Sequence, residues 1–306
     1  MPETPSTSPT SRSPRGWLSW LLGPAADEVP RGYASAATGL RLLLGLLWLY
    51  NVSWKVPPSF GEGSGTGLFK FLKEAVDNPV LPPYSFVVEH LVLPNIGLFG
   101  WGVIVVEAAL AVMLLTGSWV RLAAVLGIAE SIAIGLSVAL APGEWPWSYA
   151  LMIGAHALLL FSSAGRVFAV DGVRGLGVPP RRLTDPWGIL AIALGLYSIV
   201  TSVGDPWAAE GTGLRFTSLQ TSLGVYNVAG GLVLVVVGVL LVLATRTNPK
   251  LALAGSVVAV LGALSLYVQI GFSDPVLGGD GSSAAVLLSL AVIGSTVVMT
   301  ARGVPR

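Results

Sequence analysis

The chain has 306 residues, of which 53% are hydrophobic and only 11% are charged, against about 25% charged in an ordinary soluble domain. Seventeen basic residues nearly balance 16 acidic ones, and cysteine is absent. These values exclude a soluble globular enzyme, a disordered chain and a nucleic-acid binder, and they exclude disulfides, Cys-ligated iron–sulfur clusters and thiol catalysis. We therefore expect a polytopic membrane protein whose partner is the lipid bilayer.

Residues 1–34 contain no predicted span and are assigned to a disordered cytoplasmic tail. Residues 1–15 are rich in Ser, Thr and Pro and cannot bury enough apolar surface to fold. The apolar patch at 17–22 is too short for a signal peptide and is expected to rest on the membrane surface.

Long apolar runs follow the tail. A helix needs about 20 apolar residues to cross a bilayer core of about 30 Å. The runs are continuous, whereas the strands of a membrane barrel would alternate in polarity. We therefore predict an all-α, polytopic transmembrane helical bundle of about eight spans. They are expected at residues 35–55, 96–116, 120–140, 146–163, 187–203, 223–244, 251–272 and 284–300.

The segment between the first two spans, residues 56–95, is long for a simple connection. Apolar residues recur in it at helical spacing from Leu68 to Val76, with charged residues on the other flank. Thr66 is placed to cap the start of a helix, and Asn78, followed by proline, to end it. This pattern predicts a short amphipathic helix on the outer membrane surface. It is interpreted either as a lid over the bundle or as a docking surface or substrate gate.

Lysine and arginine mark the cytoplasmic side of a membrane protein. With eight spans, twelve of the 17 basic residues fall in the tails and loops of one side. Lys70, Lys73 and Arg215 fall on the other side, and Arg41 and Lys55 lie in or at the end of the first span. This asymmetry predicts a multi-pass protein of the bacterial plasma (inner) membrane with both termini in the cytoplasm.

Residues 173–186 are rich in Gly, Pro and Arg and form the best boundary in the chain. They are interpreted as a cytoplasmic linker between a first four-helix unit at 35–172 and a second, glycine-rich four-helix unit at 187–306. Spans of the second unit carry glycines seven residues apart, so that each pair lies on one helix face. This favours tight helix packing, with a membrane-buried site as the alternative. The pairs are Gly188 and Gly195, Gly231 and Gly238, and Gly255 and Gly262.

Three ionisable residues lie about 15 Å deep in consecutive spans of the first unit, namely Glu107, Glu130 and His156. A charge in hydrocarbon costs at least about 2.5–3.5 kcal/mol, so such groups persist where they pair, line a cavity or do chemistry. We expect them to face one polar cavity as catalytic, proton-exchanging groups, which suits a quinone or a proton-coupled carrier. The structural alternative pairs Glu107 or Glu130 with Arg41 or His156.

A polar cluster is predicted at the outer end of the first span. Lys55 there is expected to reach the interface, or to contact an anion or a carboxylate of the long loop such as Glu89. The two histidines differ in depth and are not expected to share a haem. The candidate contacts for a substrate or quinone are Arg41, Lys55, Tyr50, Asn51, Glu89 and His90. Quinone is the one cofactor that this pattern suggests. No metal, haem, flavin or iron–sulfur motif is recognised in the sequence.

Three motifs of the first unit, in this order and spacing, resemble the DoxX/DoxD family of membrane proteins. They are Arg41-Leu-Leu-Leu-Gly45 followed by Lys55; Glu107 followed by Leu114-Leu-Thr-Gly117 and Arg121; and the segment Ala164-Gly-Arg-Val-Phe-Ala-Val-Asp-Gly172. The resemblance covers about residues 35–172, and the spans after 186 match no family that we can name.

The resemblance implies a four-helix bundle and a link to thiosulfate:quinone oxidoreductase, whose membrane subunit belongs to this family. Such an enzyme oxidises thiosulfate to tetrathionate at the outer face and passes the electrons to quinone. Other members are implicated in redox homeostasis without an established reaction, so the family alone does not fix the chemistry.

Three functions remain open from the sequence. The first is a membrane subunit of a quinone-linked redox system. Because no redox centre is recognised in the chain, electrons would pass either directly between bound substrates or through a second membrane or redox subunit. The second is a non-enzymatic scaffold or accessory subunit. The third is a proton-coupled transporter of a small solute, against which the lack of an inverted repeat argues.

Overall fold

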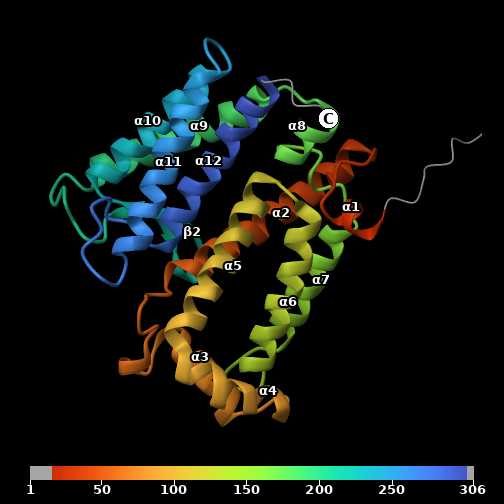
Figure 1. The fold of residues 1–306 in the computed structure, drawn as a ribbon, viewed down its shortest axis with the longest axis vertical. Helices are drawn as coiled ribbons and strands as arrows, with labels where there is room; N and C mark the ends of the chain where they lie inside the picture. Colours follow the sequence, from red (N-terminus) through yellow and green to blue (C-terminus); the bar gives the residue numbers. More distant parts are fainter. Residues whose placement is uncertain (1–15, 302–306) are drawn as a thin grey trace, which may run out of the picture.

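The computed structural model describes residues 16–301, so the predicted tail residues 1–15 and the last five residues lie outside the described part. The protein is all-α, with about 70% of its residues in helices and with helices that run mostly from one end of the molecule to the other (Figure 1). We call the two ends the α3 end and the α8 end, after the helices that lie there (Figure 1).

Four long helices form the first unit. α2 packs against α5, and α6 packs against α7. The turn from α5 to α6 is tight because Gly117 ends α5 in the left-handed conformation, with φ of 66°. The four helices are α2 (Arg31–Ser53), α5 (Ile96–Thr116), α6 (Val120–Val138) and α7 (Trp147–Leu160).

The predicted amphipathic helix is confirmed as α3 (Gly67–Asp77), which begins directly after Thr66. Thr66 occupies the N-cap position, although its side chain makes no capping hydrogen bond. With α4 (Pro82–Val87), α3 lies across the ends of α5 and α6 (Figure 1). It packs on α6, and its apolar face is therefore used inside the molecule. The buried residues of this face are Leu68, Leu72 and Ala75.

α4 continues into α5 without a break. A π-helical turn (Val88–Val92) and a 3₁₀ turn (Leu93–Asn95) connect the two. The expected loop 56–95 is therefore largely helical in its second half.

The second unit also has four long helices, with a β-hairpin inserted between the first two. Strands β1 and β2 pair antiparallel, with Thr212 opposite Tyr226 and Phe216 opposite Thr221. α9 packs along α10, and α11 along α12. The elements are α9 (Arg181–Thr201), β1 (Thr212–Phe216), β2 (Thr221–Tyr226), α10 (Val228–Ala244), α11 (Lys250–Gln269) and α12 (Gly281–Ala301).

Six helices of the described residues are long and apolar enough to cross a membrane. They include α2, the α4–α5 stretch, α6, α9, α11 and α12. α7 and α10 are also apolar but have 14 and 17 residues, which is short for a span. All eight apolar runs predicted from the sequence therefore contain a helix, and six of these helices have the length and composition of a span.

The hairpin corrects one predicted boundary. Residues 223–226, expected at the start of the sixth span, belong to β2, and the helix begins at Val228. Asn227 caps this helix, since its side chain accepts a hydrogen bond from Gly230 N. The sixth apolar run is thus shared between a strand and a shorter helix.

The two units share one core. α12 packs against α2 and α5, and β2 packs against both α2 and α12. Buried apolar side chains form a continuous cluster from Trp48 and Leu110 in the first unit to Leu234 and Leu290 in the second. The second unit is therefore attached to the first by an extensive apolar contact, and not only by a linker.

The glycine pairs of α9 and α10 lie at a close contact between the two backbones. A Cβ atom added to Gly188 would lie 2.8 Å from Gly238 O, and one added to Gly231 would lie 2.7 Å from Gly195 O. The predicted tight packing is therefore confirmed for these two helices.

Residues 16–34, expected to belong to a disordered tail, are instead ordered. They contain α1 (Trp17–Leu21), and Ala25 and Ala26 are buried against the bundle. The linker 173–186 is also mostly helical, because α8 (Val170–Leu176) and the start of α9 occupy it.

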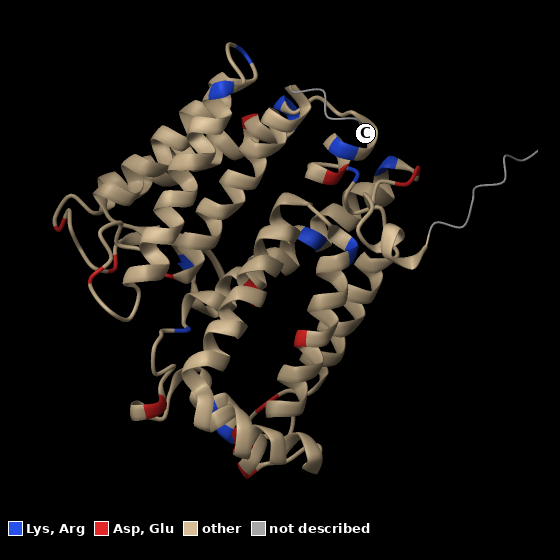
Figure 2. Ribbon diagram, viewed as in Figure 1, with Lys and Arg blue, Asp and Glu red and all other residues tan. Residues whose placement is uncertain are grey.

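Lys and Arg gather mainly at the α8 end of the molecule (Figure 2). This is the end to which the eight-span topology assigns the cytoplasmic loops. The basic residues therefore gather at the end where the loops of the predicted cytoplasmic side lie. That this end faces the cytoplasm stays a prediction.

Candidate functional site

The first unit contains a buried ion pair between Lys55 and Glu107. Lys55 follows the end of α2, and Glu107 lies in the middle of α5. Lys55 Nζ donates a hydrogen bond to Glu107 Oε1 at 3.0 Å and lies 2.7 Å from Oε2. Both side chains are 2% exposed. A second hydrogen bond from Lys55 Nζ reaches Asn51 O at 2.9 Å. The ammonium group is thus held between a carboxylate and a backbone carbonyl.

An aromatic ring completes the surroundings of Lys55. Its Nζ lies 3.9 Å from the centre of the Trp54 ring, within the range of a cation–π contact. The Trp54 ring in turn packs on Phe71 of α3, with 5.4 Å between ring centres. The ion pair is therefore connected to α3 through two aromatic side chains.

Glu130 lies near this pair. It is half-buried on α6, and its charge acts on both Lys55 and Glu107. No hydrogen-bond partner for Glu130 is found in the described part of the chain. The local set of one ammonium and two carboxylates therefore carries one net negative charge when all three are ionised.

His156 belongs to a different network. Trp48 Nε1–H donates to His156 Nε2 at 3.0 Å, and His156 Nδ1 lies 2.8 Å from Met152 O. These contacts indicate the neutral tautomer with its proton on Nδ1. A Cβ atom on Gly127 of α6 would clash with the imidazole ring. His156 thus fills a junction of α2, α6 and α7, and both ring nitrogens are used there.

Glu89 and His90 form a separate, exposed pair on the π-helical turn. His90 Nδ1 lies 3.8 Å from Glu89 and 3.0 Å from Phe86 O, and its ring stacks on Phe86. The suggested contact between Lys55 and Glu89 is therefore replaced by the pair with Glu107. Tyr50 and Asn51 contribute backbone carbonyls, to Ser53 Oγ and Lys55 Nζ respectively.

Arg41 lies toward the α8 end and pairs with neither Glu107 nor Glu130. Its fully buried guanidinium donates from Nη2 to Phe168 O at 2.8 Å and lies against Gly117. Its Nε and Nη1 atoms have no hydrogen-bond partner within residues 16–301. The opposing charge that acts on it is that of Asp171.

Asp171, in the third of the motifs that resemble the DoxX/DoxD family, forms hydrogen bonds with the turn at the end of the second motif. Its carboxylate accepts hydrogen bonds from Trp119 N at 3.1 Å, Val120 N at 3.3 Å and Ala25 N at 3.4 Å. Its own N–H donates to Gly117 O at 3.0 Å. Burial raises the pKa of Asp171, while the hydrogen bonds from these three N–H groups oppose the shift. We call this arrangement the clasp of the α5–α6 turn.

Arg121 extends the clasp to the N-terminal segment. Its Nη2 lies 2.7 Å from Asp27 Oδ2, and its Nη1 donates to Trp20 O and Pro24 O. Its guanidinium also lies 4.7 Å from the centre of the Trp20 ring. The clasp and Arg121 thus join the α5–α6 turn, the segment around Asp171 and the N-terminal segment at the α8 end of the first unit.

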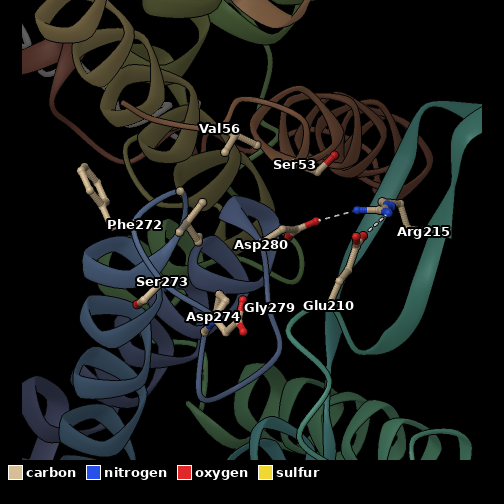
Figure 3. A pocket seen from close by; sticks show the side chains of 12 residues that line it. Ser53, Val56, Glu210, Arg215, Phe272, Ser273, Asp274, Gly279 and Asp280 are labelled. Carbon is tan, nitrogen blue, oxygen red and sulfur yellow. Dashed lines mark hydrogen bonds and ion pairs between the residues drawn. The ribbon is translucent and has the colours of Figure 1, made fainter. Parts of the chain in front are cut away.

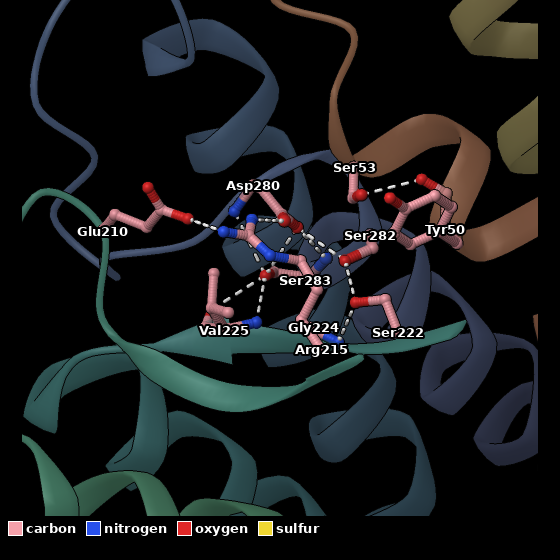
Figure 4. A network of polar contacts seen from close by, with 10 residues as sticks. All are labelled: Tyr50, Ser53, Glu210, Arg215, Ser222, Gly224, Val225, Asp280, Ser282 and Ser283. Atoms are coloured by element: carbon pink, nitrogen blue, oxygen red, sulfur yellow. Dashed lines mark hydrogen bonds and ion pairs between the residues drawn. The ribbon is translucent and has the colours of Figure 1, made fainter. Parts of the chain in front are cut away.

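Sequence reasoning missed a polar cleft of about 530 Å³ at the hairpin (Figure 3). Arg215 bridges Glu210 and Asp280, the latter at 3.1 Å. Asp280 also accepts from Ser283 N at the start of α12, and serines 222, 282 and 283 complete the network (Figure 4). The order Asp-Gly-Ser-Ser before an apolar run is a helix-start signal that could have found Asp280. With Asp274 the cleft is lined by three carboxylates and one guanidinium, which disfavours an anion.

The chain matches no protein-family model, no curated protein and no solved structure. The fold and the contacts of the buried groups are therefore the basis on which a function is assigned.

Proposed function

We propose that the protein is a membrane subunit of a quinone-linked redox system of the bacterial plasma membrane. In this proposal α7 and α10 also cross the bilayer, which gives eight spans with both termini in the cytoplasm. The first unit is a DoxX-like bundle and the second a glycine-rich one. The observation that carries the proposal is the buried Lys55–Glu107 pair with Glu130 close by.

Ionisable groups in a membrane are costly and mark proton or substrate pathways more often than not. Reduction of a quinone takes up two electrons and two protons. In a thiosulfate-dependent reaction, two thiosulfate ions, one quinone and two protons give one tetrathionate and one quinol. Glu107 and Glu130 are suited to deliver these protons, and Lys55 to stabilise negative charge as it develops.

The residues of the site fit a quinone headgroup chemically. An ammonium group and a protonated carboxyl are hydrogen-bond donors of the kind that bind carbonyl oxygens. By contrast, the acidic polar cleft at the hairpin is unsuited to a dianion such as thiosulfate. Thiosulfate oxidation is therefore assigned to a partner subunit or to another surface of this chain.

The test is thiosulfate-dependent reduction of a water-soluble quinone by the purified protein. We expect E107Q to lower the rate by about a hundredfold, the usual scale for loss of a proton-transfer group. The matched control is E62Q, because Glu62 is exposed on the connection before α3. Reduction at an unchanged rate in E107Q would overturn the role proposed for Glu107, and no reduction in a folded, monodisperse sample would mean that thiosulfate oxidation needs the partner subunit.

A scaffold is the second candidate, and the His156 network and the clasp favour it. In both, the polar atoms of His156 and Asp171 form hydrogen bonds that hold helices and turns of the bundle together. Under this alternative Glu107 only holds α5 to the end of α2. Size-exclusion chromatography of E107Q separates the two, because loss of assembly with no turnover in any variant would favour the scaffold.

A further inference from the structure

α3 and the ion pair are connected by a short chain of side-chain contacts. Phe71 projects from α3 onto the Trp54 ring, and the Trp54 ring lies over Lys55 Nζ. Lys55 in turn reaches Glu107. The path from an amphipathic helix at the α3 end to a buried carboxylate therefore has only two intermediate side chains.

Trp54 is placed to fix the position of the ammonium group. A lysine side chain is long and flexible, so its Nζ stays at one place only where the surroundings restrict it. Glu107 and Asn51 O restrict Nζ through hydrogen bonds, and the Trp54 ring bounds it at 3.9 Å. The Trp54 ring is itself held by Phe71, the two rings being inclined at 58°.

α3 is attached to the bundle mainly through apolar side chains, and Phe69 N donates a hydrogen bond to Phe60 O. Three buried residues, Leu68, Leu72 and Ala75, face the bundle, and Ser85 Oγ donates to Ala75 O. The other face carries exposed Lys70, Lys73 and Asp77. A helix attached in this way can separate from α6 without breaking the hydrogen bonds of any long helix.

We propose that Trp54 is a positioning residue that couples α3 to the Lys55–Glu107 pair, so that α3 acts as the lid of this pair. When α3 lies on α6, Phe71 holds Trp54 and Trp54 holds Lys55 on Glu107. When α3 leaves α6, Lys55 loses this restraint and the pair opens toward the α3 end. This inference rests on the proposed function in one respect, namely that the Lys55–Glu107 pair is the reacting site.

Coupling of this kind is reciprocal, so breaking the ion pair must also loosen α3. The natural chain has no cysteine, which makes L72C a single reporter on the buried face of α3. We measure its labelling rate with a membrane-impermeant maleimide in the full-length protein. We expect K55Q, W54A and F71A each to raise the labelling rate of L72C by about fivefold or more. W54F and F71Y keep an aromatic ring at each position, and we expect the labelling rate in these variants to equal that of L72C alone.

Two controls separate coupling from general loosening. K70C lies on the exposed face of α3 and should label at the same rate in every background. R41Q removes another buried cation of α2 at the opposite end, and should leave L72C protected. Equal labelling of L72C in K55Q and the parent, or an equal rise in R41Q, would overturn the inference. The readout needs no turnover, so a failure of quinone reduction does not affect it.

Discussion

Among the ion pairs of the described residues, Lys55–Glu107 is the one in which both side chains are almost fully buried. Removing one partner of a buried pair leaves an uncompensated charge, which costs about 3–5 kcal/mol, whereas replacing both by apolar residues is often neutral. We expect K55M to be destabilised by about this amount, and K55M/E107L to recover most of it. Thermal unfolding in detergent, followed by tryptophan fluorescence, measures both.

The comparison of single and double variants decides the role of the pair. If K55M/E107L is as unstable as K55M alone, the two charges do not neutralise each other and the contact is incidental. A distant exposed pair, Lys73 and Asp77 of α3, serves as the control. K73M should change stability by less than about 1 kcal/mol, because exposed ion pairs contribute little.

The place of a residue along its helix could be predicted, whereas the direction of its side chain could not. Sequence spacing places Glu107, Glu130 and His156 at one depth, because depth depends only on the rise per residue. Which partner each one meets depends on the rotation and packing of the helices. Thus Glu107 meets Lys55, while His156 meets Trp48. The direction of a buried group is a tertiary property that no local pattern contains.

At the level of elements, the α9–α10 contact depends on glycine. A Cβ atom on Gly231 would lie 2.7 Å from the backbone oxygen of Gly195, and the backbone cannot move aside cheaply. We expect G231A to lower stability by about 1–3 kcal/mol through overpacking. Gly102 of α5 has no atom within 4 Å of such a Cβ, so G102A should be neutral or stabilising by about 0.5–1 kcal/mol. Thermal unfolding of both variants checks this, and equal losses would contradict it.

Helices were easier to predict than the hairpin for a physical reason. Continuous hydropathy and the 3.6-residue period are local, and they located α3 and the eight apolar helices. The strand β2 has no such signal, because Leu223 and Val225 continue the apolar run of α10. Its strand conformation depends on pairing with β1 and on packing against α2 and α12.

For the whole molecule, the eight-span topology differs from a six-span one in a measurable way. With eight spans, Lys73 and Ala209 lie outside and Arg182 and Asn248 inside. If α7 and α10 did not cross, Arg182 would lie outside and Ala209 inside. We expect an impermeant maleimide added to intact cells to label K73C and A209C but not R182C or N248C. Labelling of R182C without A209C would show six spans, and permeabilised cells control for reactivity.

The clasp of the α5–α6 turn has a consequence for the order in which the chain is made. Trp119 receives its acceptor from Asp171, which lies 52 residues later. In a nascent chain that ends before Asp171, the N–H groups of Trp119 and Val120 have no such carboxylate. Since domains fold as their residues leave the ribosome, the α5–α6 turn reaches its final form only after α6 and α7 have been synthesised. The first unit is therefore completed from its last-made segment.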